Sequence, residues 1–206
     1  MIGLLTDSNA QLPPELASER AVEVIPLTVL IDGRTHLEGV DLKHDDFYSA
    51  LADGAEVSTS QASPGEFVEH HERLERAGVA DIVSIHVGGE LSGTLNSARL
   101  ASEMVTAKVH LVDSAQTSFG LGWCVLAAAD ARDAGGDVDA MVTAALGRGR
   151  LIKNVFVMGG LELARASGRM ELDETHESAF DGGDEVPVMA FADGALNVLG
   201  SGRRRS

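Results

Sequence analysis

Short apolar runs alternate with segments of helical length along this chain, and this alternation constrains the fold more than any other feature. The runs IGLLTD (2–7), DIVSIHV (81–87) and KVHLVD (108–113) are strand-like, and each is followed by a segment typical of a helix. Strands that alternate with helices of about 10 to 15 residues predict βαβ units and a mostly parallel sheet with helices on both faces. We therefore expect an α/β fold, with residues 1–150 as its main domain.

Local signals indicate where some elements begin and end. The run VEVIPLTVLID (22–32) is strand-like, and Asp32-Gly33 at its end predicts a hairpin turn. The stretch SPGE (63–66) places a proline directly after a serine and a glutamate three residues after that serine. This spacing predicts a capping box at the start of a helix, which we expect to end at Gly78.

The pattern changes after Gly160. A short helix is expected over residues 161–167, and an acidic loop follows it. The run VPVMAFADGALNVLG (186–200) then predicts two strands joined by Asp193-Gly194 in an antiparallel hairpin. We expect residues 151–206 to form a small, truncated second lobe that contains this hairpin.

Composition argues against several classes of protein. The chain has 16 Lys and Arg against 32 Asp and Glu, a net charge of -16, whereas nucleic-acid binding requires a basic surface. Its apolar runs are shorter than the roughly 18 residues that a membrane span needs. The N-terminus has no secretion signal, and the single cysteine, Cys124, cannot form an internal disulfide. These features predict a cytoplasmic protein.

Four segments rich in Ser and Thr follow predicted strands. They are TDSNA (6–10), STSQAS (58–63), GGELSGT (88–94) and DSAQTSFGLG (113–122). In open α/β sheets, ligands bind at the carboxyl ends of the strands, and helix N-termini favour a carboxylate or phosphate there. Taken alone, each hydroxyl is better explained as a helix N-cap. Only the convergence of several segments at one sheet edge predicts an anion-binding site.

Enzyme and metal chemistry have weaker support. Ser92 is a candidate nucleophile, but the sequence has no G-x-S-x-G elbow, and we expect His86, at the end of a buried strand, to be a core histidine. The adjacent His70 and His71 point in different directions, and the spacing typical of metal ligands is missing. The glycine loops do not match a nucleotide-binding P-loop. We expect no metal and no cofactor.

Together, these segments and several C-terminal motifs resemble the DegV family of bacterial fatty-acid-binding proteins. The motifs occur in the family's order along essentially the whole chain. They are TDSNAQLP (6–13), VIPLTVLIDG (24–33), STSQAS (58–63), LSGTLNSA (91–98), VDSAQTSFGLG (112–122), LARASGRM (163–170) and PVMAFADG followed by GSGRRR (within 187–205).

The resemblance implies a carrier that holds one long-chain fatty acid in an apolar tunnel, with the carboxylate at a hydroxyl-rich mouth. In family members paired with a fatty acid kinase of the Dak type, the kinase phosphorylates the bound carboxylate, and the acyl phosphate enters phospholipid synthesis. The resemblance therefore implies a lipid-binding protein that is not itself an enzyme.

The resemblance also assigns roles to individual residues. The expected carboxylate contacts are Thr59 and Ser92. The supporting residues in the same loops are Ser60, Gly93 and Thr94. The basic residues expected to face the kinase or its phosphates are Arg169, Arg203 and Arg205.

Family members commonly extend well beyond the position at which this chain ends. The resemblance therefore implies an abridged C-terminal lobe, with the tunnel closed by a partner or by a homodimer mate, or else a sequence that is cut. Two other functions remain open at this point. One is a small acyl hydrolase or transferase that uses Ser92, and the other is an interaction module that has lost lipid binding.

Overall fold

The structure is a computed structural model that describes residues 1–157, 185–192 and 195–203. The chain divides into two compact units, Met1–Ile152 and Lys153–Ser206. The expected helix over 161–167 and the expected Asp193-Gly194 turn lie outside the described residues.

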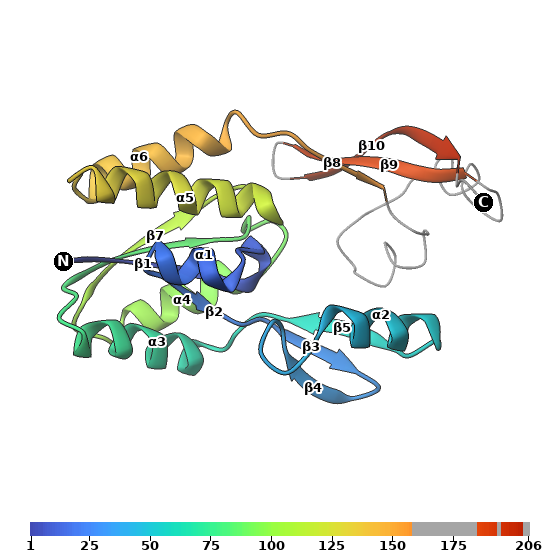
Figure 1. Ribbon diagram of the computed structural model, residues 1–206, viewed down its shortest axis with the longest axis horizontal. Helices are drawn as coiled ribbons and strands as arrows, with labels where there is room; N and C mark the ends of the chain where they lie inside the picture. Colours follow the sequence, from blue (N-terminus) through green and yellow to red (C-terminus); the bar gives the residue numbers. More distant parts are fainter. Residues whose placement is uncertain (158–184, 193–194, 204–206) are drawn as a thin grey trace. The chain divides into compact units, whose positions relative to one another are not determined.

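The first unit is built on a parallel sheet of four strands in the order β2-β1-β6-β7 (Figure 1). The strands are β1 (Ile2–Asp7), β2 (Val22–Ile25), β6 (Asp81–His86) and β7 (Lys108–Asp113). All three pairings between them are parallel. Strands buried on both faces read as near-continuous apolar runs, which is why β1 and β6 were recognisable in the sequence. The prediction of a mostly parallel sheet is confirmed.

Helices cover both faces of this sheet. The helices are α1 (Pro14–Glu19), α3 (Pro64–Arg76), α4 (Thr94–Ser102), α5 (Phe119–Asp133) and α6 (Val138–Gly149), and a short 3-10 turn, η1 (Ser8–Ala10), follows β1. Leu4 and Val83 pack with α1, α5 and α6, whereas the adjacent Leu5 and Ile82 pack with α3 and α4. Side chains alternate across a strand, so neighbouring residues belong to separate cores. The two layers are visible above and below the sheet in Figure 1.

Two local predictions hold in this unit. Ser63 Oγ accepts a hydrogen bond from the Glu66 N–H, and the Glu66 carboxylate accepts one from the Ser63 N–H, so the capping box is confirmed. Cys124 is fully buried in α5, and burial raises the pKa of its thiol to about 11. A thiol with such a pKa stays protonated, so Cys124 acts as a small core residue.

One predicted strand is wrong in its extent. Residues 22–32 form two strands on either side of Pro26, which has no N–H with which to continue the pairing. The first part, β2, joins the parallel sheet, and the second, β3 (Thr28–Ile31), belongs to an antiparallel sheet with the order β4-β3-β5. The turn after β3 is confirmed, with Asp32 and Gly33 at φ values of 48° and 75°.

The other strands of this antiparallel sheet are β4 (Arg34–Leu37) and β5 (Val57–Ser60), and α2 (His44–Ala52) lies between them in the chain. Residues 58–60 were expected in a loop and instead form most of β5. This strand pairs with β3 in a register that sets Thr59 opposite Val29.

The second unit contains an antiparallel sheet with the order β10-β9-β8. Its strands are β8 (Asn154–Val157), β9 (Glu185–Ala192) and β10 (Ala195–Arg203). The predicted antiparallel hairpin is confirmed as β9 and β10, with a register shift between Val198 and Gly200. Within the ranges that the structure describes, no helix is both long and apolar enough to cross a membrane.

Candidate functional site

Strands β1, β6 and β7 end at the same edge of the parallel sheet, and the loops that follow them are joined by hydrogen bonds. Asn9 Oδ1 accepts bonds from the Ser118 N–H (2.9 Å) and from the Thr117 hydroxyl (3.1 Å), which links the loop after β1 to the loop after β7. The Gly88 N–H donates to the Gln116 carbonyl (2.9 Å), which links the loops after β6 and β7. These three hydroxyl-rich segments therefore form one cluster.

Asp7, the last residue of β1, is fully buried and ties its own loop to β6. Its Oδ2 accepts hydrogen bonds from His86 Nδ1 (2.9 Å) and the Val87 N–H (3.1 Å), and its Oδ1 accepts one from the Asn9 N–H (3.1 Å). A carboxylate only accepts, so Nδ1 of His86 carries a proton in this bond. His86 Nε2 lies 2.7 Å from Ser84 Oγ. The buried carboxylate is therefore paired and hydrogen-bonded, as a charge in a protein interior must be.

The chain of contacts from Asp7 through His86 to Ser84 has the order of a Ser-His-Asp triad, but its position argues against catalysis. All three side chains are 0% exposed, so Ser84 is not accessible to a substrate. A serine nucleophile also needs a base within hydrogen-bond reach. Ser92 contacts Thr94 instead of a histidine. His86 is thus a satisfied core histidine, as predicted.

Asp113 fixes the glycine loop after β6. Its two carboxylate oxygens each lie 3.2 Å from the Gly89 nitrogen, and Oδ1 also accepts a bond from the Ala115 N–H (2.9 Å). A Cβ at Gly89 would lie 2.9 Å from Asp113 Oδ2, a spacing that real Cβ atoms essentially never show. Glycine at this position therefore permits the close approach that anchors the loop.

Ser92, Gly93 and Thr94 lead into α4. Ser92 Oγ lies 2.8 Å from Thr94 Oγ1 and accepts a bond from the Thr94 N–H at 3.3 Å. The N-cap residue is Gly93, which has no capping side chain, so Ser92 satisfies the first helical N–H from one residue further out. Ser92 was expected to be the N-cap residue of this helix, but it lies one residue before the N-cap. Thr94 is fully buried, whereas Ser92 is half-buried and reaches the surface.

Thr59 and Ser60 are exposed on β5, and neither lies at a helix N-terminus, because α3 begins only at Pro64. This corrects the expectation that both candidate headgroup contacts are at helix starts. The structure still brings the two segments together. A Cβ at Gly93 would lie 3.1 Å from Gln61 Nε2, so the side chain of Gln61 rests directly on the Ser-Gly-Thr turn. Thr59 is two residues before Gln61, about 7 Å along an extended strand.

The role of Gln61 was not predicted. The residue lies within the motif STSQAS (58–63), but an exposed glutamine after two hydroxyl residues carries no periodic or catalytic signal that would assign it a role. The role of Ser8 was not predicted either. Its hydroxyl donates to Glu38 Oε2 (2.5 Å) and accepts a bond from the Leu27 N–H (2.9 Å). Ser8 thus connects the loop after β1 to the antiparallel sheet that carries β5.

The charge pattern around α4 and α5 favours an anion. The first turns of both helices contain no acidic residue. A helix N-terminus carries about half a positive charge, which an acidic residue in the first turn would offset. The site thus combines exposed hydroxyls with helix starts that have no acid in their first turns, while the carboxylates of Asp7, Glu90 and Asp113 lie at the neighbouring strand ends and in the loop after β6.

A buried histidine lies under this edge of the sheet. His71, on α3, is 0% exposed, and its ring centre is 6.1 Å from that of Phe67, which in turn stacks edge-to-face on His86 at 5.1 Å. Burial, together with the nearby His86 and His70, lowers the pKa of His71 from 6.5 to about 4. His71 is therefore neutral at pH 7.

The basic residues expected to face a kinase are only partly described. Arg203 is exposed at the end of β10, in the second unit. Arg169 and Arg205 lie outside the described residues. Among the residues that are described, no group of three or more His, Cys, Asp or Glu side chains is arranged to hold a metal ion.

The fold and the site together define a class: an α/β protein with a doubly covered parallel sheet and a hydroxyl-rich loop cluster at its carboxyl edge. The family model described as "Uncharacterised protein, DegV family" matches residues 1–178. The chain therefore belongs to the DegV family.

Similarity to individual proteins agrees with this assignment. A DegV domain-containing protein of Streptomyces coelicolor is 35% identical over 169 residues, which cover 82% of this chain and 60% of that protein. A solved fatty-acid-binding DegV family protein from Thermus thermophilus is 30% identical, with a TM-score of 0.84 over 98% of this chain and 72% of that one. DegV of Bacillus subtilis, described as a fatty acid binding protein, is 25% identical, with a TM-score of 0.86 over 99% and 72% of the two chains.

Proposed function

We propose that this chain binds a long-chain fatty acid and holds its carboxylate with the hydroxyls of Ser92 and Thr59. The proposal rests on the arrangement of Ser92 on the turn before α4, next to the segment that carries Thr59. It is supported by the DegV relatives of known structure that are described as fatty-acid-binding proteins.

The hydrogen bonds around Ser92 suit a carboxylate ligand. When the Thr94 hydroxyl donates to Ser92 Oγ, the Ser92 oxygen accepts two bonds, one from this hydroxyl and one from the Thr94 N–H. The Ser92 O–H then remains as a donor toward the surface. Thr94 is buried and acts through Ser92. A bond donated to an ionised oxygen contributes about 1.5–3 kcal/mol.

The acyl chain would supply most of the affinity. Each CH₂ group removed from water contributes about 0.8 kcal/mol, so a long chain outweighs the headgroup contacts. The hydroxyls would instead select a carboxylate over an alcohol or an ester. In this proposal the chain is a carrier without catalytic activity.

The proposal includes one further part, which comes from the family resemblance. It is presentation of the bound lipid, in the cytoplasm, to a fatty acid kinase that forms the acyl phosphate. Arg203, exposed on β10, is the described residue that would face such a partner. Acyl-phosphate formation by a Dak-type kinase with ATP, dependent on this protein and reduced in Arg203→Ala, would support this part.

Native mass spectrometry of the freshly purified chain, with extraction and identification of its lipid, tests fatty acid binding. We expect one fatty acid per chain, and isothermal titration with palmitate after delipidation should show an affinity loss of about 10- to 100-fold in Ser92→Ala and Thr59→Ala. Ser102→Ala, at the other end of α4, is the matched control and should bind as the wild type does. A lipid-free protein that ignores palmitate contradicts the proposal. Turnover of a chromogenic ester that is lost in Ser92→Ala would establish the hydrolase instead.

A further inference from the structure

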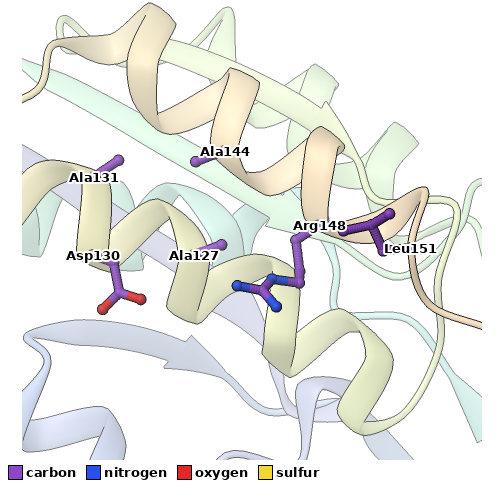
Figure 2. A pocket seen from close by; sticks show the side chains of 6 residues that line it. All are labelled: Ala127, Asp130, Ala131, Ala144, Arg148 and Leu151. Atoms are coloured by element: carbon purple, nitrogen blue, oxygen red, sulfur yellow. The ribbon is translucent and has the colours of Figure 1, made fainter.

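A groove runs between α5 and α6, away from the proposed carboxylate site at Ser92 and Thr59 (Figure 2). It has a volume of about 510 Å³ and is open to solvent. The residues that line it are Ala127, Asp130, Ala131, Ala144, Arg148 and Leu151. The floor consists of alanines, which let another polypeptide approach the helix backbones closely.

Large apolar side chains lie exposed at one end of this groove. Leu151 is 79% exposed and Trp123 is 48% exposed. The Arg148 guanidinium lies 6.0 Å from the centre of the Trp123 ring, and Phe119 packs edge-to-face on the same ring. Aromatic residues and arginine are enriched in protein–protein interfaces, and apolar side chains that gather on one surface mark such contacts.

The charges along the groove indicate what covers it. Helices α5 and α6 are consecutive and lie side by side, so the end of α5 is next to the start of α6. Asp130 therefore lies toward one end of the groove and Arg148 toward the other. The Asp130 side chain remains 67% exposed although it accepts a bond from Arg20 at 2.6 Å. A face with an acid at one end and a base at the other is complementary to itself after a two-fold rotation.

We propose that the α5/α6 face is the docking site for a second copy of this chain, related by a two-fold axis. In this arrangement Arg148 of each copy pairs with Asp130 of the other, so the ion pair forms twice, as an isologous interface requires. Leu151 of each copy enters the alanine-lined groove of the other. The apolar contact supplies the association energy, and the two charge pairs set the orientation.

The size of the face sets the expected strength. With 15 residues, α5 is about 22 Å long. A contact limited to this helix pair should bury an area of about 1,200 Å², the lower limit for specific interfaces. We therefore expect a dimer that dissociates on dilution. Its formation is independent of the proposed lipid binding.

Sedimentation velocity over a range of protein concentrations tests the pairing. The wild type should show a concentration-dependent dimer, and Arg148→Glu and Asp130→Lys should each weaken it at least tenfold, because each places like charges opposite one another twice. In Asp130→Lys, Arg20 keeps its bond with Asp133 (3.1 Å), so the fold should persist, and a circular dichroism melt checks this. Arg76→Glu, on the exposed side of α3, makes the same charge change outside the groove and should dimerise as the wild type does.

A mixture of the two variants provides the decisive result. Arg148→Glu and Asp130→Lys chains should recover a dimer when mixed, since the mixed pair contains one native and one reversed ion pair. Recovery of the dimer on mixing supports the two-fold arrangement. A purely structural role of either residue does not explain such a recovery. A wild type that stays monomeric throughout, variants that dimerise as well as the wild type, or a mixture that stays monomeric would each overturn the proposal.

Discussion

Acid should destabilise the first unit through His71. This side chain on α3 is 0% exposed, and within the described part of the chain neither of its ring nitrogens has a hydrogen-bond partner. Burial lowers its pKa from 6.5 to about 4, and repulsion from His86 and His70 acts in the same direction. Glu75 alone opposes this shift. His71 is consequently a buried base that folds in its neutral form.

The sign and size of the effect follow from proton linkage. The unfolded chain protonates His71 near pH 6.5 and the folded chain only near pH 4, so the unfolded state binds more protons between these values. The stabilisation is complete above pH 6.5 and is lost as the pH falls toward 4. Each unit of pKa difference corresponds to about 1.4 kcal/mol, which gives a total of about 3.5 kcal/mol, of which roughly 2 kcal/mol is lost by pH 4.5.

Urea unfolding followed by circular dichroism between pH 4.5 and 7.5 measures this loss. The variant His71→Leu has no titrating group at this position, so its stability relative to the wild type should rise by about 2 kcal/mol between pH 7 and pH 4.5. It also removes two unsatisfied buried nitrogens, which should leave it at least as stable as the wild type at pH 7. His36→Gln, at a half-buried position on β4, should keep the wild-type dependence on pH. Equal pH slopes for His71→Leu and the wild type would show that protonation of His71 does not cause the loss of stability.

Three glycine substitutions, one of them a control on α6, test the packing around the loop cluster. Gly122→Ala, on α5, places a Cβ 2.6 Å from the Ala10 carbonyl oxygen, so it should destabilise the fold by about 1–3 kcal/mol in thermal unfolding. Gly147→Ala, on α6, places a Cβ with no atom within 4 Å, so it should stabilise the fold by about 0.5–1 kcal/mol. Equal stability of the two variants would contradict the close approach at Gly122. Gly93→Ala should leave the melting temperature almost unchanged, because the exposed side chain of Gln61 can move away from the new Cβ. It should nevertheless weaken palmitate binding in titration. Unchanged binding would argue against a headgroup site at this turn.

The candidate site was only partly predictable. Ser92 was identified because it follows a strongly apolar strand at the predicted carboxyl edge of the sheet. Thr59 was assigned from the family resemblance, but its strand was missed, because β5 consists mostly of exposed polar residues and has no apolar period. Gln61 lies within the quoted motif STSQAS, but no role was predicted for it, because its importance depends on a contact with Gly93, far along the chain.

The sequence alone predicted the α/β class, the positions of the main parallel strands along the chain, the capping box at Ser63 and the β9–β10 hairpin. These features depend on residues that are close in the chain, where periodicity, turn chemistry and capping act directly. Pro26 is a local reason for a break in the apolar run 22–32, but the packing of the whole chain was needed to show that the two parts join different sheets. Only the tertiary structure decided the bond between Asp7 and His86, which are 79 residues apart. Such contacts form between chain segments that only the packed sheet brings together, and no local pattern records them.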